Sequence, residues 1–145
     1  MAIVQRDVHI NASPLETEAV MNDAARWPEW YPGMTRIDIS PPFPEKGGKV
    51  VFGVKSAGLT MEITETVLDN HPGALLLMQM DGMFSGQARW ELAAEGEGTH
   101  LTTTFDYTMP GGPLGKIMDA LVVKRMNGKS LGEALVNLKA RVEKP

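Results

Sequence analysis

The sequence PLGKIMDALVVKRMNGKSLGEALVNLKARV, residues 113–142, is the longest stretch of the chain with a helical pattern. Apolar residues recur along it at alternating steps of three and four positions, which is the spacing of one face of an α-helix. The positions are Leu114, Ile117, Leu121, Leu131, Leu135, Leu138 and Val142. Pro113 suits the first position of a helix. The sequence therefore predicts one long C-terminal helix of about 45 Å.

The chain before this helix is rich in strand and turn signals. A first strand is expected over residues 3–11, where apolar and polar residues alternate. The segment Ser13-Pro14-Leu15-Glu16 then predicts a capping box that starts a short helix, and a second helical turn is expected over residues 24–30. Six more strands are expected at residues 34–40, 49–55, 59–68, 75–80, 84–93 and 100–109. Most of the seven are joined by short turns, so we expect a strongly curved antiparallel sheet.

Composition limits the classes of function. The 145 residues suit one domain, residues 1–145, and the net charge is −4 with scattered basic residues, which argues against nucleic-acid binding. No apolar run approaches the roughly 18 residues of a membrane span, and the N-terminus lacks the apolar core of a signal peptide. A cytoplasmic protein is the default expectation. The absence of cysteine excludes disulfides and thiolate chemistry.

Several stretches, taken in order, resemble the START/polyketide-cyclase superfamily (SRPBCC), which shares the birch-pollen-allergen fold. They are VHINASPLETEAV at residues 8–20, DAARWPEWYPG at 23–33, WELAAEGEGTHLTTTFDYTMPGG at 90–112, and the closing amphipathic helix. The resemblance implies an α+β helix-grip fold: a seven-stranded curved antiparallel sheet wrapped around a long C-terminal helix, with two short helices between strands 1 and 2. It also implies a cavity between sheet and helix that holds an apolar or amphipathic ligand.

The middle of the long helix independently favours a cavity. Continuing its apolar rhythm requires residues 124 and 128, and these are Lys124 and Gly128, with Gly132 one turn later. A glycine inside a helix costs roughly 1 kcal/mol relative to alanine, so something should offset the pair. One interpretation is close helix–sheet contact or a kink, and the other is room for a ligand.

Strand alternation and the aromatic segment RWPEWYPG, residues 26–33, indicate which side chains line this cavity. We expect the aromatic segment to cover one end, as a static plug or as a gate. The chain has ten methionines, which suit either an adaptable pocket or simple gap filling. The predicted ligand-binding residues are Trp27, Trp30, Tyr31, Phe52, Val54, Met61, Ile63, Met78, Met80, Phe84, Trp90, Thr103, Phe105, Tyr107, Ile117, Leu121, Lys124 and Gly128.

The sequence contains no catalytic motif of a known type. There is no G-x-S-x-G and no His, Asp or Glu spacing typical of a metal site, so neither metal nor cofactor is predicted. Weak catalytic candidates are Glu65, Tyr107 and Lys124. Glu65 and Lys124 could form an ion pair or anchor the polar end of a ligand, unless Lys124 extends to the cavity mouth or a strand bulge turns Glu65 outward. Tyr107 and Thr103 could donate hydrogen bonds to a carbonyl.

Three functions remain open at this point. The first is non-catalytic binding or carriage of a small hydrophobic or amphipathic partner such as a lipid, a quinone or a polyketide-like compound. The second is a cyclase or dehydratase that uses acid–base groups of the same cavity. Cyclase and aromatase members often use arginine there, and the inward sets of this chain contain none. The third is a protein-interaction module. The sequence does not decide between monomer and homodimer.

Overall fold

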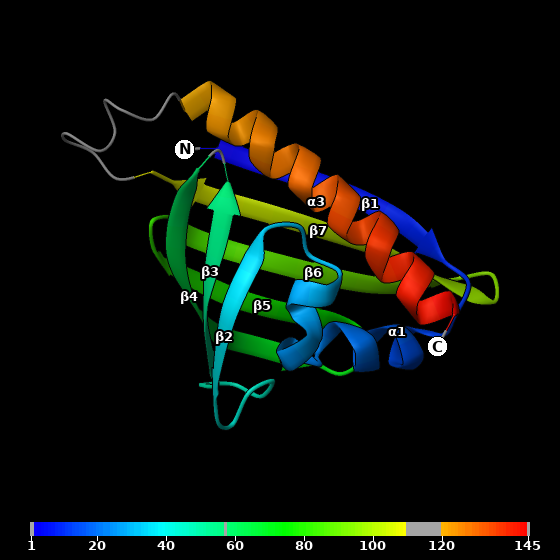
Figure 1. The fold of residues 1–145 in the computed structure, drawn as a ribbon. Coiled ribbons are helices and arrows are strands. Elements are labelled where there is room, and N and C mark those ends of the chain that lie inside the picture. The colour runs from blue at the N-terminus through cyan, green and yellow to red at the C-terminus, as the bar shows by residue number, and fades with distance from the viewer. Residues whose placement is uncertain (1, 57, 110–119, 145) are drawn as a thin grey trace.

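The computed structural model describes residues 2–56, 58–109 and 120–144, and its main element is a seven-stranded antiparallel sheet. The strand order is β1-β7-β6-β5-β4-β3-β2, so chain neighbours pair except where β1 joins β7. The strands are β1 (Ala2–Ile10), β2 (Met34–Ser40), β3 (Lys49–Ser56), β4 (Leu59–His71), β5 (Leu75–Gly82), β6 (Ser85–Glu95) and β7 (Gly98–Thr108). The sheet curves strongly, and its concave side faces the long C-terminal helix (Figure 1).

Two short helical segments close one end of this curved sheet (Figure 1). Helix α1 (Pro14–Met21) begins as the sequence predicts, because the Ser13 hydroxyl accepts a hydrogen bond from the Glu16 amide at 3.2 Å. The same hydroxyl donates to the Glu16 carboxylate at 3.0 Å, which completes the cap. The 3-10 helix η1 (Ala24–Glu29) follows directly and carries the start of the aromatic segment.

Helix α3 (Ala120–Glu143) packs chiefly against β1, the edge strand that lies beside it in Figure 1. Its C-terminal half supplies Leu131, Leu135 and Leu138, all fully buried. Burying a leucine side chain contributes roughly 1.5–3 kcal/mol, so these residues fix the helix on the sheet.

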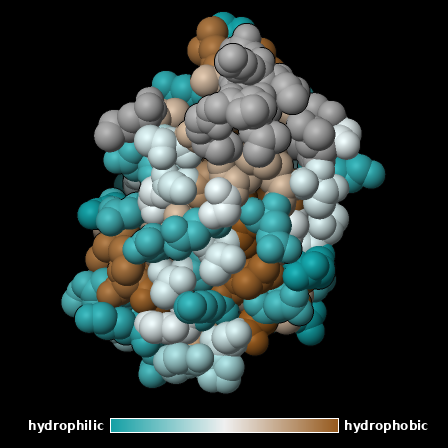
Figure 2. Space-filling model, turned by 90° about the vertical axis from the view of Figure 1, so that its left-hand side faces the viewer, coloured by the Kyte–Doolittle hydropathy of each residue, from teal (hydrophilic) through white to brown (hydrophobic). Residues whose placement is uncertain are grey.

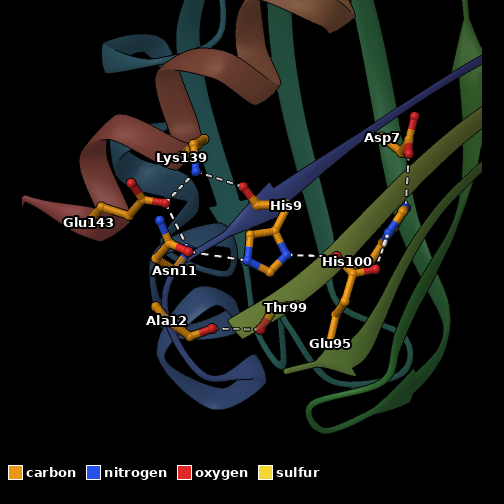
Figure 3. A network of polar contacts seen from close by, with 9 residues as sticks. All are labelled: Asp7, His9, Asn11, Ala12, Glu95, Thr99, His100, Lys139 and Glu143. Atoms are coloured by element: carbon orange, nitrogen blue, oxygen red, sulfur yellow. Dashed lines mark hydrogen bonds and ion pairs between the residues drawn. The ribbon is translucent and has the colours of Figure 1, made fainter. Parts of the chain in front are cut away.

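A polar cluster holds the end of α3 to the ends of β1, β6 and β7 (Figure 3). Lys139 Nζ donates to the His9 carbonyl at 2.7 Å and lies 2.6 Å from the Glu143 carboxylate. That carboxylate also accepts from the Asn11 amide at 2.7 Å. The cluster continues across the outer face of the sheet, where Glu95 contacts both His9 and His100. We use the name polar cluster for the set Asp7, His9, Asn11, Glu95, His100, Lys139 and Glu143.

The fold confirms the predicted class, and one end of each of the strands β4 to β7 differs from expectation by two or three residues. Strand β4 runs to His71 rather than residue 68, and β5 runs to Gly82 rather than residue 80. The extension of β4 contains a register shift between Val67 and Asp69, which lengthens the strand without ending it. The predicted first turns of the long helix, residues 113–119, lie outside the described residues.

Candidate ligand-binding cavity

A cavity of about 70 Å³ lies between the concave face of the sheet, the aromatic segment and α3. The space suits a few water molecules or a small chemical group, since an apolar cavity of about 150 Å³ is known to hold a benzene ring. A larger occupant therefore requires wall side chains to shift. The described residues that line the cavity are Met21, Trp27, Trp30, Tyr31, Met34, Phe52, Val54, Ile63, Glu65, Leu76, Met78, Met80, Phe84, Trp90, Phe105, Tyr107, Asn127 and Ser130.

Trp27 closes one end of the cavity and is held from several sides. Its indole Nε1 donates to the Met21 carbonyl at 2.8 Å, which ties η1 to the end of α1. The ring packs edge-on against Phe43 and Phe52, with centroids 5.8 and 6.0 Å away. Gly33 then turns the chain into β2 with φ +77°, and a Cβ there would lie 2.5 Å from the Lys55 carbonyl oxygen. Local geometry therefore demands glycine at this turn.

Trp30 lies deeper in the same segment and connects it to both the sheet and α3. Its ring meets Trp90 of β6 edge-on at 6.2 Å between centroids. Its backbone carbonyl accepts a hydrogen bond from the Asn137 side-chain amide at 3.0 Å. An ion pair between Arg141 and Glu29, at 2.8 Å, adds a second link between α3 and this end. The aromatic segment is thus anchored to α3 on one side and to the sheet on the other.

Glu65 is the one acidic residue among the described side chains that line the cavity, and it is only 6% exposed. On β4 it pairs in register with Val50 of β3 and Met80 of β5, so its lateral neighbours are apolar. Within the described part of the chain no residue donates a hydrogen bond to its carboxylate, and burial alone raises its pKa to about 8. The register shift in β4 falls after this position, at Val67, so Glu65 keeps its inward direction.

Two tyrosines contribute hydroxyl groups to the cavity. Burial and, secondarily, the charge of Glu65 raise the pKa of Tyr31 well above its usual range, so the Tyr31 hydroxyl stays protonated close to that carboxyl. Tyr31 as a residue is only partly buried, but its hydroxyl end lies inside. The Tyr107 hydroxyl accepts a hydrogen bond from the Asn127 side-chain amide of α3 at 2.9 Å. No described residue accepts the Tyr107 proton.

Most of the predicted ligand-binding side chains on the strands and in the aromatic segment do line the cavity. Two predicted strand residues do not: Met61 and Thr103 are buried in the core without lining it. The Thr103 hydroxyl has no hydrogen-bond partner among the described residues. Ile117 lies outside the described residues.

Three predicted residues in the described part of the long helix do not line the cavity. Leu121 is 56% exposed and Lys124 is exposed, so neither points into the cavity, and Lys124 forms no pair with Glu65. Gly128 is buried, but a Cβ there would lie 2.5 Å from Nη2 of Arg6, so it faces β1 and not the cavity. The first of the two interpretations, close helix–strand contact, therefore accounts for Gly128.

The cavity wall contributed by α3 consists of Asn127 and Ser130. Both are polar or small, so a search for apolar periodicity passes over them. In the order Val123, Asn127, Ser130 and Ala134, the residues follow one another in steps of four, three and four positions, which puts them on one face of the helix. Val123 and Ala134 are buried, so this spacing is the signal that would have identified the face. Met21, Met34 and Leu76 also line the cavity and were not among the predicted binding residues.

On the face shown in Figure 2, hydrophobic residues form separate patches divided by hydrophilic ones. Among residues 2–56, 58–109 and 120–144, no helix is long and apolar enough to span a membrane. In the same ranges, no three acidic or histidine side chains gather in a way that would hold a metal ion.

The curved sheet, the closing helix and the cavity between them define a helix-grip protein. The family model described as polyketide cyclase/dehydrase and lipid transport matches residues 1–143, and the chain belongs to this family. Membership supports a ligand-binding or polyketide-processing role. A search of curated proteins found no match.

Solved structures show the same fold at low sequence identity. The Zhui aromatase/cyclase from Streptomyces sp. R1128 is 16% identical with a TM-score of 0.80, covering 99% of this chain and 94% of its own. Ara h 8.0201 is 13% identical with a TM-score of 0.71, covering 99% of each chain. The Aha1 dimer from Colwellia psychrerythraea is 15% identical with a TM-score of 0.68, covering 99% and 98%. At these identities the likeness concerns the fold alone.

Proposed function

We propose that the protein binds a small amphipathic molecule in the cavity, with its apolar part among the aromatic and methionine side chains and its polar end against Glu65. The observation that carries this proposal is one buried carboxyl group, without a protein donor among the described residues, in a mainly apolar enclosure. A buried polar group without a partner costs stability, so a partner supplied by a ligand would recover that cost. Family membership supports the same role.

The walls suit an occupant larger than the present space. Met78 and Met80 of β5 line the cavity beside Glu65, and Met21 and Met34 line it from α1 and β2. Methionine side chains are unbranched and change rotamer at little cost, so they can retreat from a ligand. A lipid, quinone or polyketide-like compound would need this adjustment. Reversible binding of such a compound would serve carriage.

Tryptophan fluorescence tests binding directly, because all three tryptophans of the chain line the cavity. We expect a series of linear alcohols from butanol to octanol to perturb this fluorescence, with affinity rising about three- to fourfold per added methylene until the cavity is full. Native mass spectrometry of the purified protein should show a bound small molecule. No fluorescence change with any alcohol, together with no bound molecule, would refute the proposal.

A pair of variants on β3 provides the matched control. Val54 lines the cavity, whereas Val51 has the opposite strand parity and lies outside it. Val54→Phe should fill the space and weaken hexanol binding by about tenfold or more, since added bulk in a packed site is not accommodated. Val51→Phe should leave hexanol binding within about twofold. Equal effects from both variants would place the alcohol elsewhere.

A second candidate function is catalysis of a ring closure or dehydration in the same cavity. The observation in its favour is that Glu65, with a pKa of about 8, is a protonated acid at neutral pH, and the Tyr107 proton has no acceptor among the described residues. Glu65 would give its proton to a departing hydroxyl group, whose bond to carbon breaks so that it leaves as water, and the neighbouring carbon would return a proton to the Glu65 carboxylate as a carbon–carbon double bond forms. Glu65→Gln should then abolish turnover of a polyketone substrate while hexanol affinity stays within a few-fold. Turnover that survives this change would exclude Glu65 as the acid.

A further inference from the structure

The described lining of the cavity contains acidic and neutral side chains and no cationic one. Among the described residues that line the cavity, none is lysine, arginine or histidine, and the titratable ones are Tyr31, Glu65 and Tyr107. Lys124, which the sequence allowed to face Glu65 or to extend outward, is exposed and does not line the cavity. Any ligand with a carboxylate or phosphate head would therefore meet a carboxyl group and no counterion. The described wall of the cavity therefore offers an anion no opposite charge.

The aromatic walls add to the same preference. Trp27, Trp30 and Trp90 line the cavity together with Tyr31 and Phe52. The face of an aromatic ring carries partial negative charge, and indole attracts cations more strongly than the other rings do. Aromatic rings and a carboxyl group that line the same cavity both favour an organic ammonium group.

We propose that the ligand of this cavity carries a basic amine, whose ammonium group binds the Glu65 carboxylate and the surrounding tryptophan rings. This inference rests on the proposed binding function and specifies the class of its ligand. It follows from the burial of Glu65, from its lack of a donor among the described residues, and from the absence of a cationic side chain in the described cavity wall.

The proton balance of this binding step gives it a distinctive pH dependence. Below a pH of about 8 the empty cavity holds Glu65 as the neutral acid. When an ammonium ion binds, the carboxyl group loses its proton to solvent, and an ion pair forms. Tyr31 and Tyr107 stay protonated throughout, since burial raises both of their pKa values. Affinity for an amine therefore rises with pH up to about 8, and affinity for a carboxylate does not.

Three probes with the same six-carbon tail test the proposal: hexylamine, hexanol and hexanoate. At pH 8 we expect hexylamine to bind about tenfold or more tighter than hexanol, because a hydrogen bond between charged groups is about twice as strong as a neutral one. Hexanoate should bind weakest. Between pH 6 and pH 8 the hexylamine affinity should rise about tenfold or more, while the hexanol affinity stays level.

Two variants on β4 separate the role of Glu65 from a general charge effect. Glu65→Gln keeps the size of the side chain and should abolish the preference for hexylamine over hexanol, with hexanol binding retained. Glu62→Gln removes an exposed carboxylate from the same strand, where it pairs with Arg36 at 3.5 Å, and should leave the preference intact. Circular dichroism verifies that both variants are folded.

The outcomes distinguish this inference from the function on which it rests. If hexanol binds as tightly as hexylamine at every pH, the cavity binds amphipathic molecules but the amine is refuted. If hexanoate binds tightest, the amine is refuted and a cation outside the described residues must face the ligand. If no probe binds, both the amine and the proposed binding function fail.

Discussion

Glu65 in the cavity and Glu143 in the polar cluster are both glutamates that folding takes away from bulk water to some degree, yet folding shifts their pKa values in opposite directions. Burial among apolar side chains raises the pKa of Glu65 to about 8. The Asn11 amide and then Lys139 lower the pKa of Glu143 below its ordinary value. One carboxyl group has lost water without replacement, and the other has received two donors in its place (Figure 3).

The contrast distinguishes the polar cluster, whose charged groups are paired and stabilise the fold, from the cavity, where a carboxyl group has no partner among the described residues. In the polar cluster each carboxylate and each imidazole has protein partners, so the ends of β1, β7 and α3 hold together without help. In the cavity a carboxyl group is unpaired among the described residues. Proteins tolerate such a cost mainly where function requires it, and this supports placing the binding site at Glu65.

The largest effect is expected from Glu65→Gln at high pH. Because folding raises the pKa of Glu65 above the value of the unfolded chain, this group stabilises the native state fully below about pH 4.5 and progressively less as pH rises through about 8. The free energy of unfolding of the parent protein should therefore fall by about 2–5 kcal/mol from this group between pH 5 and pH 9. Glu65→Gln should remove that loss, as urea unfolding at pH 5, 7 and 9 will show.

The exposed Glu62 provides the control for this measurement. Glu62→Gln should leave the pH dependence of unfolding as it is in the parent protein, since its carboxylate lies on the outer face of the same strand. If the parent protein loses no stability between pH 6 and pH 9, then Glu65 is hydrated or paired in solution. The contrast between the two regions would then disappear.

The opposite sign of pH dependence is expected in the polar cluster. A lowered pKa means that Glu143 stabilises the fold above about pH 4.5 and loses this contribution as pH falls through its folded-state value. Glu143→Gln should lower the thermal unfolding midpoint at pH 7 and flatten its decline between pH 5 and pH 3. The change should be smaller than that at Glu65, because solvent screens the cluster. A matching loss in Lys139→Met would assign the effect to their contact, and no loss in either variant would show the cluster to be inert.

A smaller gain in stability is expected at a second unpaired group of the interior. The Thr103 hydroxyl is fully buried and has no partner among the described residues. Valine has the same shape without the hydroxyl, so Thr103→Val should raise the free energy of unfolding by about 1 kcal/mol. Urea unfolding at pH 7 measures this change. A loss of stability instead would show that the hydroxyl has a partner in solution, such as bound water.

The sequence was sufficient to predict the sheet and most of its inward-facing side chains, because both predictions depend on the short-range alternation of residues along a strand. Alternation along a strand fixes which residues share a face, and the pattern around Glu65, Met78 and Trp90 survived into the structure. Glu65 would have turned outward had a bulge come before it, and the sequence could not locate the bulge. The structure places the register shift at Val67, just beyond it.

The helix shows where the sequence was insufficient. Its apolar rhythm extends correctly over Leu131, Leu135 and Leu138, where the helix packs against other elements. Extrapolated backwards, the rhythm selects Leu121 and Lys124, but the residues facing the cavity are Asn127 and Ser130. A helix face that borders a cavity need not be apolar, so periodicity has no signal there. The pairing of Lys124 with Glu65 was wrong for this reason.

Alanine substitutions at Gly128 and Gly132 of α3 should have the smallest effects on the free energy of unfolding. They also test whether either position lines the cavity. A Cβ at Gly132 would meet nothing within 4 Å, so Gly132→Ala should gain about 0.5–1 kcal/mol from helix propensity alone. A Cβ at Gly128 would displace the end of the Arg6 side chain, which offsets the same gain, so Gly128→Ala should be close to neutral. Urea unfolding measures both changes, and hexanol affinity should stay the same in both variants because neither glycine lines the cavity. Weakened hexanol binding in Gly128→Ala alone would return this position to the cavity wall and would favour the interpretation that its missing side chain makes room for the ligand.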